Sequence, residues 1–553
     1  MKLTGSQIVL EVLLEQGVDT VFGYPGGTAL NIYDELYKYS DKINHVLTAH
    51  EQGASHAADG YARATGKTGV VMSTSGPGAT NLVTGIATAY MDSIPIVAIT
   101  SNVPDNLIGR DAFQEICITG VTMPITKHNF FVNDIDELAD TLREAFRIAG
   151  SGRKGPVLVD ITKDVTAAVT DYVKKDAVEP SPLPIIKDED VDAIAAMINK
   201  AKKPVAYIGG GVVASDAAEE VRALIDKCNI PVTYTLMAAG VIGHDHPMNL
   251  GMLGMHGTIS ANKAISQADF VLTLGARFSD RVALNTKSFA KKADIAMVDI
   301  DKSEINKNVE VDVSCIGDVK DFVTKLLPKV KEAEHPEWDE TITQWKEKER
   351  VVKAPGCKLH PSEIVEIMCD KAEDDTIYVT DVGQHQMWAA QYIKHNAAKK
   401  FLTSGGLGTM GYGYGAAIGA QIACPDNRVI HITGDGSFHM NLNEACTAVS
   451  NNLPIITVIM NNQVLGMVYQ WQTIFYDKRF SNTTPERKTD FVKLIEAFGG
   501  TGYRAETPEE FAEAMDKALM ADGPVWIDCR ISREERVLPM IPPTKSVESM
   551  IID

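Results

Sequence analysis

Short apolar, β-branched runs alternate along the chain with longer amphipathic stretches. The runs include TVFGY, GVVMS, IPIVAIT, PVAYI, FVLTL, IAMVDI and IITVIM, and most lead into Gly, Asp or Asn. Runs that are apolar on both faces and separated by helix-length segments are typical of parallel strands covered by helices on both sides. The pattern predicts an α/β fold.

Two segments rich in charge and proline interrupt this alternation, at residues 172–190 and about 327–362. They separate three blocks, each about the size of one domain. We therefore predict three doubly wound parallel-sheet domains at residues 1–171, 190–326 and 363–535, followed by a C-terminal tail at 536–553.

The first and third blocks repeat one order of features. VVMSTSGPGATN is followed by a helix-length stretch and IPIVAIT, and VIHITGDGSFHM is followed by a helix-length stretch and LPIITVIMNN. This echo has two interpretations. It is either the pattern common to all strand–helix–strand units or a sign of two related domains that face each other across a ligand.

Charge and composition exclude several classes of partner. The 553 residues include 53 basic and 73 acidic side chains, a formal net charge of −20, which repels the phosphates of nucleic acids and of anionic membranes. No apolar stretch approaches the ~20 residues that span a bilayer, and no signal-peptide pattern stands at the N-terminus. The eight cysteines form no CxxC pair and indicate neither a zinc site nor a disulfide framework. We expect a cytoplasmic protein with no nucleic-acid or membrane partner.

The third block contains a motif with direct chemical meaning. The run that ends in Gly434-Asp435-Gly436 places a carboxylate at a strand end, and the next run delivers Asn462 to the same edge, where open α/β sheets bind ligands. Carboxylate, amide and carbonyl oxygens suit Mg²⁺, which completes its shell with water and phosphate oxygens. Backbone N–H groups at a helix start near Ser437 would meet a diphosphate. The alternative is a common glycine turn.

This motif resembles that of thiamine-diphosphate-dependent enzymes. Within that superfamily the chain is similar, nearly end to end, to the acetolactate synthase (acetohydroxyacid synthase) catalytic large subunits. The matching stretches are VFGYPGG, HEQGA, TSGPGATNLVTGIA, AFQE, MPITKHN, LGMHGT, GARFSDR and NNQVLGMVYQWQ. The resemblance implies a pyrimidine-binding domain first, an FAD-binding domain in the centre and a diphosphate-binding domain last.

The resemblance also implies a set of residues for the thiamine cofactor. Asp435, Asn462 and the backbone oxygen of Val464 would bind Mg²⁺. The residues expected around thiamine diphosphate are Gln384, His385, Gly408, Met410, Gly434, Gly436, Ser437 and Gly466.

Glu51 lies where a strand-like run meets an alanine-rich helix, in LTAHEQGASHAADGYA. From this segment alone it is a helix-start acid that faces the helix dipole. By resemblance it hydrogen-bonds the aminopyrimidine ring from the opposite domain of a partner subunit and drives deprotonation of the thiazolium carbon. The small residues that follow are then expected to pack at a dimer interface: Gly53, Ala54, Ser55, Ala57 and Ala58.

The resemblance implies further residues for the substrates. The catalytic set adds Gly27, Gln114, Lys163, Arg281 and Trp471 to Glu51, with Phe113, Met255 and Met467 on the access path. Trp471 would select a slightly larger acceptor, because a pocket gains about 1 kcal/mol per well-packed methylene, and Arg281 would bind the acceptor carboxylate. The structural alternatives are a core aromatic and a surface charge. Thr28 and Cys117 depart from the family pattern near this path, which leaves acceptor preference and inhibitor sensitivity open.

The central block predicts a second cofactor. YIGGGVVA fits a G-x-G-x-x-A turn after a strand, but the next strand ends at Thr235 without the acid that would bind an NAD ribose. By resemblance the block binds FAD, in a structural role because the reaction is redox-neutral. The alternative is a relative that keeps this domain without a flavin. The residues expected to contact FAD are Arg153, Gly210, Gly211, His256, Gly257, Gly275, Arg277, Asp299 and Asp318.

The implied activity is that of an acetolactate synthase. Such an enzyme decarboxylates pyruvate on thiamine diphosphate and ligates the hydroxyethyl unit to a second 2-ketoacid, pyruvate or 2-oxobutanoate, in branched-chain amino-acid biosynthesis. Its active sites would lie at the interface of a homodimer or homotetramer, and binding of a small regulatory subunit stays open. The rival interpretations are another thiamine carboligase, such as a sulfoacetaldehyde-type or fermentative enzyme, and a non-catalytic flavoprotein. Trp471 argues against the fermentative enzyme, and intact Glu51, Asp435 and Asn462 argue against the non-catalytic one.

Overall fold

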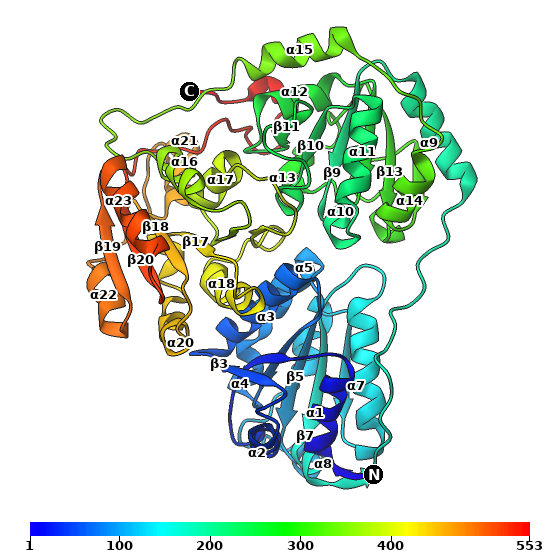
Figure 1. The fold of residues 1–553 in the computed structure, drawn as a ribbon, viewed down its shortest axis with the longest axis vertical. Helices are drawn as coiled ribbons and strands as arrows, with labels where there is room; N and C mark the ends of the chain where they lie inside the picture. The colour runs from blue at the N-terminus through cyan, green and yellow to red at the C-terminus, as the bar shows by residue number, and fades with distance from the viewer.

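The computed structural model describes all residues 1–553 and contains three six-stranded parallel sheets with helices on both faces (Figure 1). The prediction of three doubly wound α/β domains is confirmed. A short antiparallel pair, β1 (Lys2–Thr4) with β8 (Val169–Asp171), closes the first domain. The three sheets are called the N-terminal, central and C-terminal sheets below. The domain boundaries given above stay a prediction.

The N-terminal sheet has the order β3-β2-β4-β5-β7-β6. Its strands are β2 (Thr20–Tyr24), β3 (Asn44–Leu47), β4 (Gly69–Ser73), β5 (Ile96–Asn102), β6 (His128–Val132) and β7 (Val157–Thr162). Its helices are α1 (Gly5–Glu15), α2 (Leu30–Lys38), α3 (Glu51–Thr65), α4 (Pro77–Asn81), α5 (Val83–Asp92), α6 (Ile118–Thr122), α7 (Ile135–Gly150) and α8 (Lys163–Ala167).

The C-terminal sheet repeats this order as β16-β15-β17-β18-β20-β19. Its strands are β15 (Ile377–Thr380), β16 (Phe401–Leu402), β17 (Val429–Gly434), β18 (Ile456–Asn461), β19 (Thr501–Ala505) and β20 (Val525–Arg530). Its helices are α16 (Pro361–Lys371), α17 (Gln384–Tyr392), α18 (Tyr412–Ala423), α19 (Asp435–Phe438), α20 (Ala445–Ser450), α21 (Gly466–Phe475), α22 (Phe491–Phe498) and α23 (Pro508–Leu519). One shared order over a whole sheet favours two related domains over a chance likeness of strand–helix–strand units.

The central sheet has a different order, β11-β10-β9-β12-β13-β14, which is the order of dinucleotide-binding folds. Its strands are β9 (Pro204–Ile208), β10 (Val232–Tyr234), β11 (Asn249–Met252), β12 (Phe270–Leu274), β13 (Asp294–Asp299) and β14 (Val313–Ile316). Its helices are α9 (Asp188–Lys200), α10 (Gly210–Ala214), α11 (Ala218–Cys228), α12 (Ile259–Gln267), α13 (Asp280–Ala283) and α14 (Val319–Leu326). The strand order reverses between β9 and β12, so a ligand crevice is expected there.

Helices α3 and α18 join the N-terminal and C-terminal domains and lie side by side in the middle of Figure 1. A Cβ on Gly60 would stand 2.1 Å from the carbonyl oxygen of Ala416, and one on Gly419 would stand 1.9 Å from that of Ala57. The expected dimer contact of the small residues after Glu51 is therefore wrong: Ala54, Ala57 and Ala58 are fully buried within a single chain. Close approach of two backbones inside the chain requires these small side chains.

The second linker contains a helix that its composition concealed. Helix α15 (Pro336–Lys346) presents Trp338, Ile342 and Trp345 on one face, and all three are buried in the core of the central domain. Trp338 Nε1 also donates to the carbonyl of Pro204 at 3.1 Å. These apolar residues recur at helical spacing, so part of this linker is packed structure.

Candidate functional site

The GDG segment lies where it was expected, at the carboxyl edge of the C-terminal sheet. Asp435 begins α19 directly after β17, and Asn462 follows the neighbouring parallel strand β18. Asp435 is 4% exposed, and burial raises its pKa to about 6. Its Oδ1 atom is buried without any hydrogen-bond partner. Because a buried polar atom normally has a partner, this oxygen is suited to bind a cation.

The other expected metal ligands stand beside Asp435. Asn462 Nδ2 donates to Gln384 Oε1 at 3.2 Å, and Asn462 Oδ1 accepts the N–H of Val464 at 3.2 Å. No group of three or more His, Cys, Asp or Glu side chains in the chain could hold a metal. A single carboxylate with amide and carbonyl oxygens suits Mg²⁺ that is also bound to phosphate, so these residues fit Mg²⁺ with thiamine diphosphate.

Two glycines pack closely against the expected cofactor residues His385 and Gln384, next to these ligands. A Cβ on Gly434 would stand 2.8 Å from the His385 ring, and one on Gly466 would stand 2.1 Å from Gln384 Oε1. The Nε2 atom of His385 is buried without a partner, and burial lowers the pKa of this imidazole to about 4. A neutral ring with a free nitrogen can donate one hydrogen bond to a phosphate oxygen.

The loop before α18 completes this side of the site. Gly408 has φ of +71°, in the left-handed region, and Gly411 N donates to Ser437 Oγ at 3.2 Å. Met410 stands between them and is half-buried. Ser437 thus ties the start of α18 to the GDG segment.

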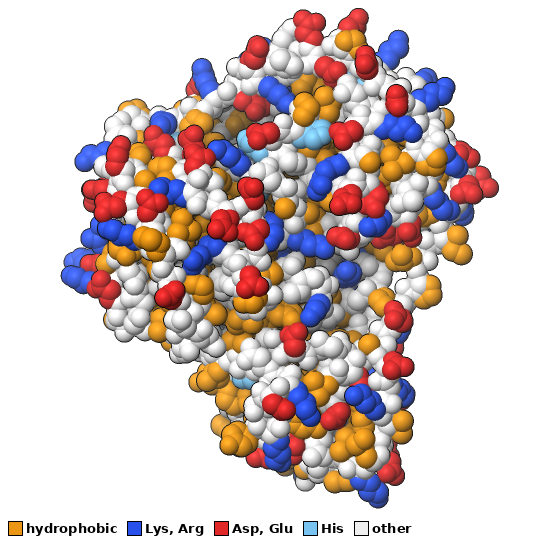
Figure 2. Space-filling model, viewed as in Figure 1, with side chains coloured by type: hydrophobic (Ala, Val, Ile, Leu, Met, Phe, Trp, Pro, Cys, Tyr) orange, Lys and Arg blue, Asp and Glu red, His pale blue; other side chains and the backbone are white.

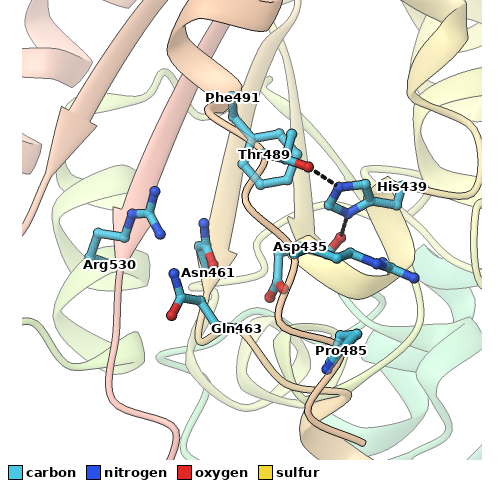
Figure 3. Close-up of a pocket in the computed structure, with 9 residues that line it drawn as sticks. Asp435, His439, Asn461, Gln463, Pro485, Thr489, Phe491 and Arg530 are labelled. Carbon is cyan, nitrogen blue, oxygen red and sulfur yellow. Dashed lines mark hydrogen bonds between the residues drawn. The ribbon is translucent and has the colours of Figure 1, made fainter. Parts of the chain in front are cut away.

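Figure 3 shows a second group of side chains around Asp435, of which the sequence singled out only Asn461, as part of the NN pair. They line a cavity of about 10 Å³, which is about the size of one water molecule. His439 Nε2 bonds Thr489 Oγ1 at 2.7 Å. The remaining members are Asn461, Gln463, Pro485, Arg487, Phe491 and Arg530. Apart from Asn461, no local motif marks them, because the group comes from four separate segments of the chain.

Glu51 lies at a helix start, as its segment alone predicts, and the catalytic interpretation stays a prediction. It is the first residue of α3, and His50 caps the helix by accepting the N–H of Gln52 at 3.1 Å. Its carboxylate also accepts a hydrogen bond from Asn81 Nδ2 at 2.9 Å, and a Cβ on Gly78 would stand 3.1 Å from it. Glu51 therefore lies against the Gly76-Pro77-Gly78 loop at the carboxyl end of β4.

Glu444 supports Glu51 from the C-terminal domain. Its carboxylate accepts the N–H groups of Ala49 at 3.1 Å and His50 at 3.0 Å, and the hydroxyl of Thr447 at 2.6 Å. The residue is fully buried, and burial raises its pKa, with the nearby negative charge of Glu51 adding to the effect. Sequence reasoning missed Glu444 as a site residue. The only sequence signal was an acid in an otherwise uncharged stretch after GDGSF.

Four of the other expected residues lie in the N-terminal domain, as two pairs. Lys163 Nζ donates to the carbonyl of Gly27 at 3.0 Å. Gln114 has φ of +61° and packs on Gly76, whose Cβ would stand 2.9 Å from it. Phe113 beside it is 88% exposed, which suits a residue that meets another surface.

A separate cluster contains the expected acceptor residues. Met255 packs with Trp471 and with Leu538 and Met540 of the C-terminal tail. Arg281 Nη1 lies 4.0 Å from Met255 Sδ, and its side chain is 63% exposed. Sequence reasoning placed no tail residue here.

Met467 packs elsewhere, against the core of the C-terminal domain. It is four residues from Trp471 on the same helix, α21. The expected access residues are therefore not one group.

Apart from Arg153, which belongs to the N-terminal domain, the expected flavin residues follow the carboxyl ends of strands of the central sheet. Gly211 and Gly275 approach so closely that a Cβ on Gly211 would stand 2.6 Å from the Gly275 Cα. Burial raises the pKa of Asp299, at the end of β13, to about 6, and His256 Nδ1 is buried without a partner. These features at the crevice between β9 and β12 fit a dinucleotide.

The remaining residues of that set flank the crevice. Asp318 caps α14, and Gly210 begins α10. Gly257 turns back on Gly254 through a backbone hydrogen bond of 2.9 Å. Arg153 and Arg277 both reach the end of α5, at Ser93 and Met91.

Three family descriptions match the chain in order. Residues 3–123 match the N-terminal TPP binding domain of thiamine pyrophosphate enzymes, residues 191–326 match their central domain, and residues 381–529 match their C-terminal TPP binding domain. No helix is long and apolar enough to cross a membrane.

Individual relatives are similar over nearly the whole chain. An acetolactate synthase large subunit from Porphyra purpurea is 44% identical over 99% of this chain and 95% of its own length. One from Mycobacterium tuberculosis is 46% identical over 98% of this chain and 90% of its own length. A probable acetolactate synthase large subunit from Methanococcus aeolicus is 43% identical over 99% of this chain and 95% of its own length.

Proposed function

The chain belongs to the acetolactate synthase large-subunit family of thiamine pyrophosphate enzymes, and we propose that its residues carry out the reaction of that family as follows. Pyruvate loses CO₂, and the remaining two-carbon unit is joined to a second 2-ketoacid. Pyruvate as acceptor gives 2-acetolactate, and 2-oxobutanoate gives 2-aceto-2-hydroxybutanoate. Both products lead to branched-chain amino acids.

Asp435, Asn462 and the carbonyl of Val464 would hold Mg²⁺, whose charge would help to bind the diphosphate of the cofactor. Thiamine diphosphate, when bound, supplies the electron sink for the carbon that loses CO₂. The observation that carries this assignment is the buried, unpartnered Oδ1 of Asp435 at the end of β17. Gly436, Ser437 and His385 meet the diphosphate from the surrounding turns.

Glu51 exchanges a proton with the pyrimidine ring. The Asn81 amide holds its carboxylate at 2.9 Å, and Glu444 fixes the turn before it. This hydrogen bonding orients the carboxylate without neutralising it by a cation, so that it can accept and return a proton.

The acceptor is bound beside the central domain. Arg281 binds its carboxylate through charge-assisted hydrogen bonds, and Trp471 with Met255 forms the apolar wall against which its alkyl group packs. Lys163, Gly27 and Gln114 line the approach from the N-terminal domain. The indole of Trp471 favours this assignment over a fermentative enzyme.

A homodimer is the smallest active unit in this proposal. Large apolar side chains remain exposed in the single chain, including Tyr24 (41%), Leu47 (53%) and Phe113 (88%) in the N-terminal domain and Met440 (55%) in the C-terminal domain. Figure 2 shows hydrophobic side chains gathered on the lower half of the visible face. Exposed apolar surface of this kind marks an interaction site, and Glu51 of one copy would face the GDG edge of the other.

The flavin, the compartment and a further subunit complete the proposal. FAD binds at the β9–β12 crevice and has a structural role, since the reaction is redox-neutral. The relatives are named large subunits, which supports a small regulatory subunit as a partner. All eight cysteines are free, as is typical of the reducing cytoplasm.

The direct test is to incubate the purified chain with pyruvate, Mg²⁺, thiamine diphosphate and FAD and to measure 2-acetolactate. We expect product only when Mg²⁺ and thiamine diphosphate are both present, with a chelator-treated sample as the control. No product under complete conditions would defeat the proposed function. Addition of 2-oxobutanoate should then yield both products.

A further inference from the structure

The end of helix α5, defined as Met91–Ser93, contacts the central domain through two arginines. Arg277 Nη2 donates to the carbonyl of Met91 at 2.8 Å. Arg153 Nε donates to Ser93 Oγ at 2.8 Å, and its Nη1 lies 2.7 Å from Glu304 Oε1 of the central domain. Both arginines belong to the proposed flavin site. One short segment therefore receives two contacts from that site.

The same segment contacts the loop that precedes α18. Asp92 Oδ1 accepts the N–H of Gly406 at 2.7 Å, and Asp92 Oδ2 accepts the N–H of Gly405 at 3.1 Å. Thr88, one turn earlier in α5, is 2.7 Å from Thr409 through the two hydroxyl oxygens. The loop at 403–411 also carries Gly408 and Met410 of the proposed thiamine site, so α5 holds it at points before and after Gly408.

A buried ion network holds Asp92 in place. Arg63 Nη2 lies 2.8 Å from Asp92 Oδ2, and its Nε lies 2.5 Å from Asp59 Oδ1. The side chains of Arg63, Asp59 and Asp92 are 6%, 0% and 0% exposed. Arg63 Nη1 donates to the carbonyl of Thr403 at 2.9 Å, and the Tyr412 hydroxyl donates to Asp59 at 2.7 Å. The network thus spans the loop from its first residue to the start of α18.

We propose that Asp92 is a positioning residue that couples the flavin site to the thiamine site. Its carboxylate receives two consecutive loop N–H groups, while the residues on either side of it receive Arg277 and Arg153. A flavin that orders these arginines then orders the end of α5 and, through Asp92, the loop at 403–411. This inference rests on the proposed cofactor sites and gives the structural flavin a specific effect on binding of thiamine diphosphate.

Coupling between two sites is reciprocal and can be measured without turnover. The experiment titrates thiamine diphosphate with Mg²⁺ into the flavin-free and the FAD-saturated protein by calorimetry. For the unaltered chain we expect FAD to lower the dissociation constant of thiamine diphosphate by about threefold or more. Flavin absorbance retained after gel filtration reports the reverse effect of thiamine diphosphate on FAD.

The test variant is Asp92→Asn. It keeps the size of the side chain but replaces one carboxylate oxygen, a hydrogen-bond acceptor, with an NH₂ group, which can only donate. One of the N–H groups that Asp92 binds therefore loses its acceptor. We expect the dissociation constant to rise about tenfold and to lose its dependence on FAD. An unchanged constant, or an FAD effect equal to that of the unaltered chain, overturns the inference.

Two further variants separate coupling from general damage. Asp160→Asn makes the same chemical change at a buried carboxylate of the N-terminal sheet that contacts Thr100 and Asn102 instead of the loop, and we expect the FAD effect to remain. Thr88→Val removes the contact to Thr409 together with a hydrogen bond to the Thr84 carbonyl inside α5. It should raise the constant about threefold with the fold intact; no change here also overturns the inference if Asp92→Asn does not fold. Failure of the unaltered chain to bind thiamine diphosphate at all would instead defeat the proposed function.

Discussion

The N-terminal and C-terminal sheets share one strand order and carry different chemistry at the same place. After its third strand, the N-terminal sheet has Gly76-Pro77-Gly78, which packs beside the carboxylate of Glu51. The C-terminal sheet has the GDG segment, with Asp435 buried and Asn462 on the next strand. Loops at the carboxyl edge of a parallel sheet can vary in sequence more freely than the strands, because they do not pack in the core. One fold could therefore carry the proposed acid–base group in one domain and the proposed metal site in the other.

A second pair of positions shows the same divergence inside the sheets. Asp160 on β7 and Asp528 on β20 occupy the fourth residue of equivalent strands, and both are buried. Asp160 accepts a hydrogen bond from Thr100 Oγ1 at 2.7 Å, whereas Asp528 lies 2.8 Å from Arg530 and 3.3 Å from Arg504. Asp160 thus bonds to an uncharged side chain and Asp528 to two arginines, although the two residues hold the same position in equivalent strands.

The largest expected effect is the loss of the proposed metal site in the C-terminal domain. Asp435→Ala removes the only carboxylate of the proposed Mg²⁺ set. Loss of an outer-shell partner already costs about 10–100-fold in metal affinity, so we expect a loss beyond about 100-fold for a direct ligand. Calorimetry with Mg²⁺ and thiamine diphosphate measures it. Unaltered binding would remove Asp435 from the site.

Glu51→Gln is the matching change in the N-terminal copy. It should leave Mg²⁺ and diphosphate binding largely intact while turnover falls about 10²-fold or more, as is typical of lost acid–base catalysis. The measurements are the rate of acetolactate formation and the dissociation constant of thiamine diphosphate in the same preparation. Near-normal turnover would return Glu51 to a purely helix-capping role.

The packing of α3 of the N-terminal domain against α18 of the C-terminal domain should be sensitive to added side-chain volume. Gly60→Ala places a Cβ 2.1 Å from the backbone oxygen of Ala416, and overpacking of this kind costs about 1–3 kcal/mol. Thermal unfolding should shift down accordingly. Gly150→Ala at the end of α7 is the control, because its Cβ would meet nothing nearer than 3.9 Å; an equal shift in both variants would show that α3–α18 packing is not the cause.

Asp160 of the N-terminal sheet predicts a pH dependence of stability. Burial raises the pKa of Asp160 to about 6, above its unfolded value of about 3.9. The folded state thus binds more protons than the unfolded state between these values, and the contribution of Asp160 to stability falls as pH rises from about 4 to 6. Asp160→Asn should remove this fall, worth about 2 kcal/mol.

The measurement for that prediction is the difference in melting temperature between Asp160→Asn and the unaltered chain across pH 4.5–7. We expect the difference to move in favour of the variant as pH rises. A difference that is flat with pH would mean that Asp160 is ionised throughout.

The smallest expected effect concerns the acceptor. Trp471→Leu removes part of the apolar wall formed with Met255 and the tail. Condensation of two pyruvates should survive, while preference for 2-oxobutanoate falls about fivefold, the value of about 1 kcal/mol per methylene. The ratio of products in competition measures it, and an unchanged ratio would reject this role.

Much of the fold and part of the site could be read from the sequence. The buried strands are visible as apolar runs, and the GDG and NN segments stand at strand ends because strand chemistry is local. The position of Asp435 near Asn462 follows because the neighbouring parallel strands β17 and β18 end at the same edge of the sheet. Such features depend on residues close in the chain or on a general rule of sheets.

Other parts of the site could not be predicted. Glu444 bonds the backbone before α3 from another domain, and Met540 of the tail packs near Trp471. No local pattern encodes such contacts, because they depend on which surfaces meet after the domains have formed. Asp92 is of the same kind, since its partners Gly405 and Gly406 come from another domain.

The sequence by itself determined the three α/β domains, the metal-site motif and the glutamate at the start of a helix. The tertiary structure decided which other parts of the molecule each of these features contacts. The small residues after Glu51 show the difference: their size predicted close packing, but only the fold showed that Ala57 meets Gly419 of the same chain. Side-chain size and polarity are local properties, whereas the partner of a surface is set by the arrangement of whole domains.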